Sequence, residues 1–240
     1  MSDKDLQHAV LNFAARFSIP VYFGHKTPQL RVVGNNGTGA FVRMNSRFIG
    51  ITCFHIIDAY RKRRAAGEAD FFYFGDVPID PEGLLISQSE RLDLVTFDFQ
   101  NLVGRSPRFA PENFYVPHRW PPSEVELGNL IVLVGFPGVW TEQTGLFHLE
   151  FSAYSFGGII DSFGEEHIYT RLLPGESIAI LQQKPGPESV GGISGAPVFL
   201  WRESPIWAAE LVGFVKEYQE SLDLLYIRRA TSLDDDGKVL

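Results

Sequence analysis

Hydrophobic positions along this chain fall in short runs rather than in long helical stripes. Brief apolar segments alternate with turns rich in glycine and proline, the pattern typical of short β-strands. In the first half, the pattern predicts six strands, at residues 29–33, 40–42, 48–52, 70–74, 84–87 and 94–97. Comparable segments continue from residue 128 to residue 230. The pattern therefore favours an all-β protein built from two halves of similar size.

Helical patterning is confined to two places. Residues 4–16 place their apolar side chains on one side, as in an amphipathic helix that packs against the strands. Residues 56–66 predict a second, short helix. Between the two halves, the proline-rich residues 106–127 are expected to form a linker that lies across the back of the molecule.

Composition agrees with one compact unit. The chain has 240 residues, of which 45% are hydrophobic, 23 are glycine and 15 are proline, which suits many short strands joined by tight turns. Its net charge of -8 argues against a general nucleic-acid binder, whose binding surface is basic. One basic run, residues 61–64, is either a solvated helix face or a docking patch for an acidic partner.

The N-terminal residues are polar and show no secretory signal, and no apolar run approaches membrane-spanning length. The single cysteine, Cys53, cannot form an internal disulfide, so a reducing cytoplasmic location is expected, without membrane association. Cys53 is expected to be a buried small hydrophobe. The six histidines are scattered and no Cys/His pair has ligand spacing, so neither a metal nor an organic cofactor is expected.

The run Gly192–Pro197 carries the strongest chemical signal. It places Ser194 between glycines and ahead of an apolar strand, which is how a nucleophilic serine is presented. Glycine before the serine permits a tight turn in which the N–H groups of Gly192 and Ser194 converge on one point. Two converging N–H groups are the donors of an oxyanion hole.

A serine needs a base and an orienting carboxylate to act as a nucleophile. His55 lies at the end of one apolar strand, just before the predicted helix, and Asp93 begins another apolar strand. Asp58 and Asp98 are alternative acids, more typical of a helix face or a turn. The sequence therefore predicts a triad of His55, Asp93 and Ser194.

The order of these residues separates the known triad types. The order His, Asp, Ser is that of the chymotrypsin type. An α/β-hydrolase needs a histidine after the serine, whereas the last histidine here is His167. A subtilisin-type enzyme needs its aspartate before its histidine, and only Asp3 and Asp5 precede His55.

With these motifs, the chain resembles trypsin-like (chymotrypsin-fold) serine peptidases and is nearest to the bacterial HtrA-like branch. The resemblance implies two six-stranded antiparallel Greek-key barrels with the active site between them and a short N-terminal helix. Five blocks carry the resemblance: residues 37–42, 48–57, 93–95, 131–138 and 192–197.

The implied organisation is a single peptidase domain spanning residues 1–240. Because only residues 230–240 follow the last predicted strand, no PDZ domain is expected. Its parts are a helix and lead-in (1–25), a first barrel (26–105), a linker (106–127), a second barrel (128–230) and a tail (231–240), whose acidic residues 234–236 are expected to fray.

Two positions depart from the family pattern. Ile193 stands where secreted trypsin-like enzymes carry an aspartate that captures a newly cut N-terminus, and Ala196 replaces the usual second glycine after the serine. Activation through capture of a new N-terminus by that aspartate is therefore absent. One hypothesis is that Ile193 leaves the oxyanion loop collapsed until a substrate or partner orders it.

The resemblance implies an intracellular serine endopeptidase that hydrolyses protein or peptide substrates through an acyl-enzyme, with a regulatory protein as a further possible partner. The alternative is a catalytically silent or latent protease-fold module that binds a peptide or protein. By the same resemblance, Glu188, Lys216 and Tyr218 are expected to line the substrate pocket. Glu188 occupies the position of the pocket floor, which would favour lysine or arginine at the cleavage site.

Overall fold

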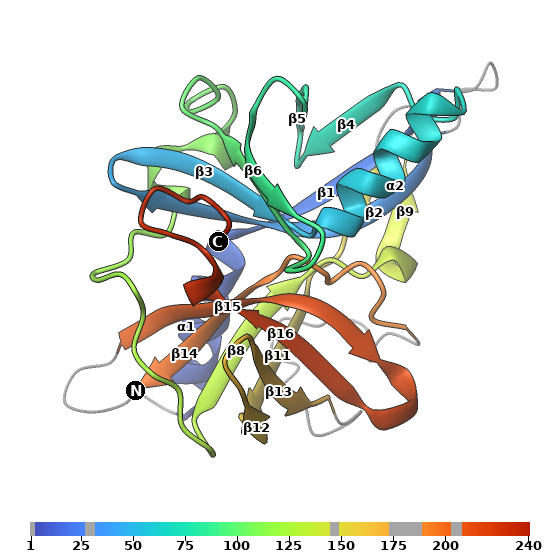
Figure 1. Cartoon of the computed structure of the whole chain (residues 1–240). Coiled ribbons are helices and arrows are strands. Elements are labelled where there is room, and N and C mark those ends of the chain that lie inside the picture. Colours follow the sequence, from blue (N-terminus) through green and yellow to red (C-terminus); the bar gives the residue numbers. More distant parts are fainter. Residues whose placement is uncertain (1–2, 27–31, 145–148, 173–188, 203–207) are drawn as a thin grey trace.

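The computed structural model describes residues 3–26, 32–144, 149–172, 189–202 and 208–240. Its strands form two curled antiparallel sheets of seven strands each, one above the other in Figure 1. The strand order is β5-β4-β1-β2-β3-β7-β6 in the first sheet and β11-β8-β14-β15-β16-β13-β12 in the second. The expected all-β fold of two antiparallel half-barrels is confirmed, but each sheet has seven strands rather than six.

The first sheet contains two strands that the hydrophobic pattern did not predict, β1 and β5. Its members are β1 (Ser18–Lys26), β2 (Val32–Met44), β3 (Arg47–Thr52), β4 (Phe71–Phe74), β5 (Val77–Pro78), β6 (Leu85–Ser89) and β7 (Leu94–Asp98). Strand β1 lies, except for Lys26, in the segment 1–25 that is expected to form the helix and lead-in. Strand β2 joins two predicted strands into one, although residues 29–31 lie outside the described residues.

Strand β1 has apolar residues at alternate positions of its sequence, with a proline between the first two, and its first four residues are all buried. Ile19, Val21 and Phe23 are buried, and the strand pairs with both β2 and β4. Pro20 lies opposite Thr38 of β2. Since proline lacks an N–H for the ladder and usually argues against an internal strand, this residue obscured an otherwise clear pattern.

The second sheet follows the linker. Its members are β8 (Leu130–Gly135), β11 (Tyr154–Ile159), β12 (Ser162–Phe163), β13 (His167–Arg171), β14 (Pro197–Arg202), β15 (Ala208–Gln219) and β16 (Leu224–Arg229). A separate ladder joins β9 (Thr141–Gln143) to β10 (Leu149–Phe151). The short 3-10 helices are η1 (Pro107–Phe109), η2 (Pro111–Asn113), η3 (Gly138–Trp140), η4 (Glu220–Leu222) and η5 (Ala230–Ser232).

Both predicted helices are present, as α1 (Asp3–Arg16) and α2 (Phe54–Ala65). Helix α1 buries Val10, Leu11 and Ala14. In Figure 1 it lies beside the second sheet, while α2 lies against the first. None of the helices in the described ranges has the length and apolar character needed to cross a membrane.

A shared apolar core joins the two sheets. Beside the separate cores of each sheet, one cluster combines residues of β2, β3 and β7 with residues of β8, β14 and β15 and with α1. Tyr115 of the linker belongs to this cluster, and its hydroxyl donates to the Ala209 carbonyl at 3.1 Å. Because protein interiors are close-packed, this common core fixes the position of one sheet relative to the other.

The C-terminal residues are folded back onto the first sheet, so the expectation of a frayed acidic tail was wrong. Leu233 is buried and forms a β-bridge with Val239. The Asp234 carboxylate accepts bonds from the N–H groups of Asp236 and Lys238, at 3.0 and 2.7 Å. Acidic side chains can cap their own turns in this way, which is why the charges did not prevent folding.

Candidate active site

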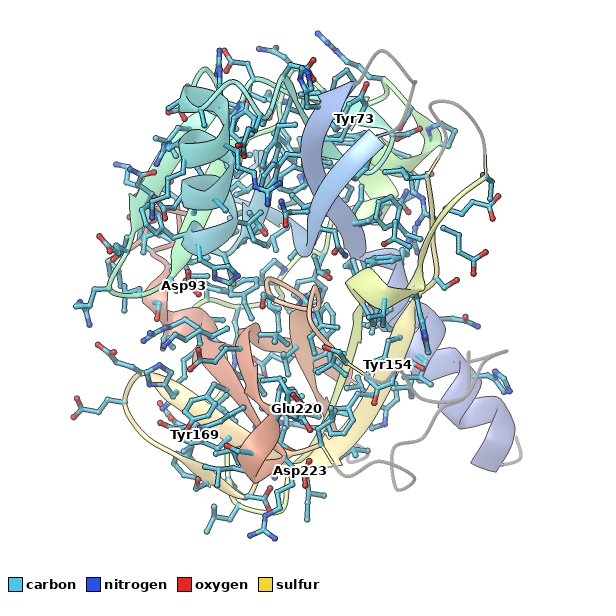
Figure 2. All side chains as sticks on the ribbon, turned by 90° about the vertical axis from the view of Figure 1, so that its right-hand side faces the viewer. Tyr73, Asp93, Tyr154, Tyr169, Glu220 and Asp223 are labelled. Carbon is cyan, nitrogen blue, oxygen red and sulfur yellow. The ribbon has the colours of Figure 1, made fainter. Side chains whose placement is uncertain are left out.

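One crevice between the two sheets contains all three residues of the predicted triad. Its volume is about 550 Å³. His55 and Asp93 come from the first sheet and its helix, and Ser194 comes from the turn before β14. Figure 2 shows Asp93 where the first and second sheets meet. The shared core therefore brings together three residues that are far apart in the sequence.

His55 and Asp93 form a close pair. The Nδ1 atom of His55 lies 2.9 Å from Oδ2 and 3.1 Å from Oδ1 of Asp93. The imidazole is half-exposed, whereas Asp93 is only 9% exposed. Because a carboxylate only accepts hydrogen bonds, this contact places the imidazole proton on Nδ1. The lone pair of a neutral His55 is then on Nε2, free to take a proton.

The backbone helps to hold Asp93 and His55 in position relative to each other. Asp93 adopts a left-handed conformation with φ of 53°, which aspartate tolerates better than most residues. Its Oδ1 atom also accepts a bond from the backbone N–H of His55, at 2.9 Å. Cys53, at the N-cap position of α2, makes no side-chain capping bond. Asp93 therefore supplies the missing cap and orients the histidine with the same carboxylate.

The turn around Ser194 leaves two N–H groups unbonded. Gly192 and Gly195 have φ angles of 103° and 91°, which favour glycine. The N–H groups of Ile193 and Gly195 donate to the carbonyls of Val190 and Val215, at 3.2 and 2.7 Å. By contrast, those of Gly192 and Ser194 have no hydrogen-bond partner within the described residues. These are the two donors that the sequence predicts for an oxyanion hole.

Ser194 and His55 line the same crevice, but no hydrogen bond between Ser194 Oγ and the imidazole is found in the described residues. Catalytic hydrogen bonds are often long in proteins without substrate and shorten when substrate binds. The missing hydrogen bond is therefore compatible with the predicted triad.

Ile193 anchors the turn in the second core. Its side chain is 1% exposed and packs among residues of the second sheet. A Cβ placed on Gly135 would lie 2.9 Å from the Ile193 Cβ, so the two backbones approach closely here. The hypothesis that the oxyanion loop stays collapsed until a substrate or partner orders it remains a prediction. Apolar burial holds position 193 without a charged partner.

The alternative acids are engaged elsewhere. Asp58 pairs with Lys62 at 2.6 Å, on one helix face, and Asp98 pairs with Arg47 at 3.0 Å. Asp58 also lines the crevice, but its charge is directed to Lys62. Asp93 is the acid that contacts His55. The pairing of Lys62 is what a solvated helix face would show.

The residues expected to contact substrate have different outcomes. Lys216 and Tyr218 of β15 line the crevice, whereas Glu188 lies outside the described residues. The Tyr218 hydroxyl donates to Asp223 Oδ1 at 2.9 Å. Burial and Asp223 raise the pKa of Tyr218 to about 12, so the phenol stays neutral. Its ring can therefore serve as a wall of the crevice while its hydroxyl is held by Asp223.

Three carboxylates of the crevice were not singled out as site residues by sequence reasoning, although Glu217 lies in the strand that was expected to line the pocket. Glu90, Glu217 and Glu220 line the crevice together with Lys216. Their only signal in the sequence was that Glu217 and Glu220 flank the residues already selected. Glu90 lies on the turn before Asp93, where nothing in the local pattern distinguishes it from other surface acids.

Cys53, His55 and Asp93 could also be considered as metal ligands. Their ligand atoms lie within 4.8 Å of one another, the one such group found in the described residues. This proximity was not expected from sequence spacing. The Cys53 thiol, however, is buried and donates to the Val215 carbonyl at 3.3 Å. Burial first, and then the Asp93 charge, raise its pKa well above its usual value, which opposes the thiolate that a metal requires.

The raised pKa gives a direct prediction for Cys53. In the folded protein we expect negligible alkylation by iodoacetamide at pH 8, because the thiolate is the reactive form and the sulfur is covered. Intact mass before and after denaturation measures it. Alkylation should be complete in urea, and rapid alkylation of the native protein would contradict the described burial.

Comparisons with known proteins give limited information. No family model matches the chain, and no curated protein sequence matches it. Among solved structures, the chain is similar to the crystal structure of a thermostable serine protease, AL20, from an extremophilic microorganism. The two share 12% sequence identity over 90% of this chain and 92% of that chain, with a TM-score of 0.49.

Proposed function

We propose that this chain is a serine endopeptidase that hydrolyses peptide bonds through an acyl-enzyme. The observation that carries the proposal is the His55–Asp93 pair, which lies in the same crevice as Ser194. The two unbonded N–H groups of the Ser194 turn support it. A nucleophile, a base, an orienting carboxylate and two donors are the parts that acyl transfer requires.

In the proposed first step, Ser194 Oγ attacks the carbonyl carbon of a peptide bond while His55 Nε2 takes the hydroxyl proton. Negative charge develops on the carbonyl oxygen, where the N–H groups of Gly192 and Ser194 donate to it. Each such donor contributes about 3 kcal/mol to the transition state. The C–N bond then breaks as His55 returns its proton to the leaving amine, which leaves an ester on Ser194.

In the second step, water attacks the ester carbonyl and gives a proton to His55. The bond between the acyl carbon and Ser194 Oγ breaks, the proton moves from His55 to Ser194 Oγ, and a free acid leaves. Throughout, Asp93 keeps the imidazole in the Nδ1–H tautomer and stabilises the imidazolium that forms in each half-reaction.

The second candidate is a protease-fold module that binds a peptide without cleaving it. The observation that favours it is the missing hydrogen bond between Ser194 Oγ and His55 within the described residues. In such a module the crevice would hold a peptide, while the serine would remain unactivated. The reactivity of Ser194 separates the two candidates.

The test is labelling of the purified protein with a fluorophosphonate, followed by peptide mapping. Stoichiometric labelling of Ser194, lost in Ser194→Ala and in His55→Ala, is expected. Ser162→Ala, which changes an exposed serine on β12 far from the triad in the sequence, should label like the parent. A folded parent that does not label would favour the binding module.

Labelling alone does not establish the substrate, so a second assay follows. The parent is incubated with a mixture of peptides whose ends are blocked, and the products are identified by mass spectrometry. Internal cleavage that depends on Ser194 is expected. A labelled protein that cleaves esters but no peptide would contradict the endopeptidase assignment.

A further inference from the structure

We infer that Thr38 of β2 is the positioning residue that holds the Ser194 turn with its two donors exposed. This inference rests on the proposed function, because it concerns the same oxyanion site. Thr38 is fully buried and does not line the crevice. It therefore acts on the reaction only through the turn that it holds.

Every polar atom of Thr38 is used. Its N–H donates to the Ser194 carbonyl at 2.8 Å. Its hydroxyl donates to the Gly192 carbonyl at 2.9 Å and accepts from the Phe136 N–H at 3.0 Å. Its carbonyl accepts from the Thr52 hydroxyl at 2.7 Å. When every polar atom of a buried residue has a hydrogen-bond partner, the residue is held in one conformation, because any other conformation would leave a buried polar group without a partner.

These bonds control the peptide units that carry the oxyanion donors. The peptide unit that joins Gly191 to Gly192 contains the Gly192 N–H. The carbonyl of this unit, on Gly191, accepts from the Gly138 N–H at 2.7 Å. The next unit begins with the Gly192 carbonyl that Thr38 holds. This unit lies between the two donors, on Gly192 and Ser194. Without the threonine hydroxyl, this unit keeps the 3.2 Å bond from the Ile193 N–H to the Val190 carbonyl but loses the partner of its own carbonyl, so it can tilt and turn a donor away from the site.

Close packing against Thr38 also determines the shape of the Ser194 turn. A Cβ on Gly195 would lie 2.0 Å from the Thr38 carbonyl oxygen, so only glycine fits there. Beside Thr38, Asn36 Nδ2 donates to the Phe136 carbonyl at 2.8 Å. Strand β2 of the first sheet therefore supports a turn that belongs to the second sheet, and the two halves of the active site are fixed to each other through it.

The test compares Thr38→Val, Thr38→Ser and Thr170→Val. Valine matches threonine in shape but lacks the hydroxyl, so we expect kcat to fall about 10- to 100-fold with KM within about threefold, as the oxyanion donors lose alignment. Serine keeps the hydroxyl and should restore kcat to within about threefold of the parent. Thr170→Val removes an equally buried hydroxyl, bonded to the Ile159 carbonyl, and should leave kcat unchanged.

A second readout does not depend on activity. Hydrogen exchange of the peptide covering residues 189–197 reports on the N–H groups of Ile193, Gly195 and Ala196, which are bonded in the structure. Faster exchange is expected in Thr38→Val and not in Thr38→Ser or Thr170→Val.

The two readouts separate this inference from the proposed function. A folded Thr38→Val with parental kcat and parental exchange would overturn the role of Thr38 and leave the peptidase assignment intact. An inactive parent whose turn exchanges faster in Thr38→Val would overturn the peptidase assignment and leave the positioning role. A loss of kcat in Thr38→Ser equal to that in Thr38→Val would also contradict the role of the hydroxyl.

Discussion

Replacing His55 with alanine is expected to lower kcat for peptide hydrolysis by about 10⁶-fold, and Ser194→Ala by a similar factor. In both variants the proton transfer from Ser194 Oγ to His55 Nε2 is lost, so the serine is no longer a nucleophile. His55 is half-exposed and its ring bonds only to Asp93 among the described residues. The variants should therefore fold, with melting temperatures close to that of the parent.

The double variant provides the sharper test. Groups that act as one unit show strongly non-additive losses, so His55→Ala with Ser194→Ala should be no slower than either single variant. Steady-state kinetics on a fluorogenic peptide, with active-site titration of the parent, measures all four proteins. Losses that multiply in the double variant would contradict a shared role for the two residues.

The second large effect is expected for Asp93→Asn, with kcat lower by about 10⁴-fold and the fold retained. An amide that donates to Nδ1 would stabilise the tautomer with its proton on Nε2, which leaves no lone pair facing Ser194. Asparagine tolerates the left-handed conformation of Asp93 and keeps an oxygen for the His55 backbone N–H. The Asp93→Asn variant should therefore lose activity while its stability stays close to that of the parent.

Asp93→Ala is the matched comparison. Alanine loses the capping oxygen and disfavours the positive φ, so the free energy of unfolding should fall by about 1 to 3 kcal/mol. Kinetics and urea unfolding of both variants measure the separation. An Asp93→Asn variant with near-parental kcat would show that the His55–Asp93 contact is structural only.

The helices and most strands were predictable because their signals are local. The apolar stripe of α1 and the apolar runs of β3, β7 and β8 each lie within one segment, and burial of such a segment follows from its own pattern. The prediction failed where a local signal conflicted with the final packing. Pro20 obscured β1, and the charges of residues 234–236 obscured a folded tail.

The shortest strands could not be predicted, for a different reason. Strands β5 and β12 have two residues each, too few for an alternation of buried and exposed positions. They form because a neighbouring strand offers unpaired backbone groups at the sheet edge. Such pairing depends on the sheet already formed rather than on the residues that join it.

Local features were enough to predict two β-rich halves and to select His55, Asp93 and Ser194 as a candidate triad, because glycine turns and apolar strands lie within single segments. The two-barrel arrangement followed from the resemblance to chymotrypsin-fold peptidases. The folded structure was needed to see that Asp93 also caps α2, that Ile193 packs in the second core, and that Thr38 bonds to the Ser194 turn. The Thr38 hydroxyl bonds a carbonyl 154 residues away. Contacts of that separation depend on how two sheets pack, and no local pattern encodes them.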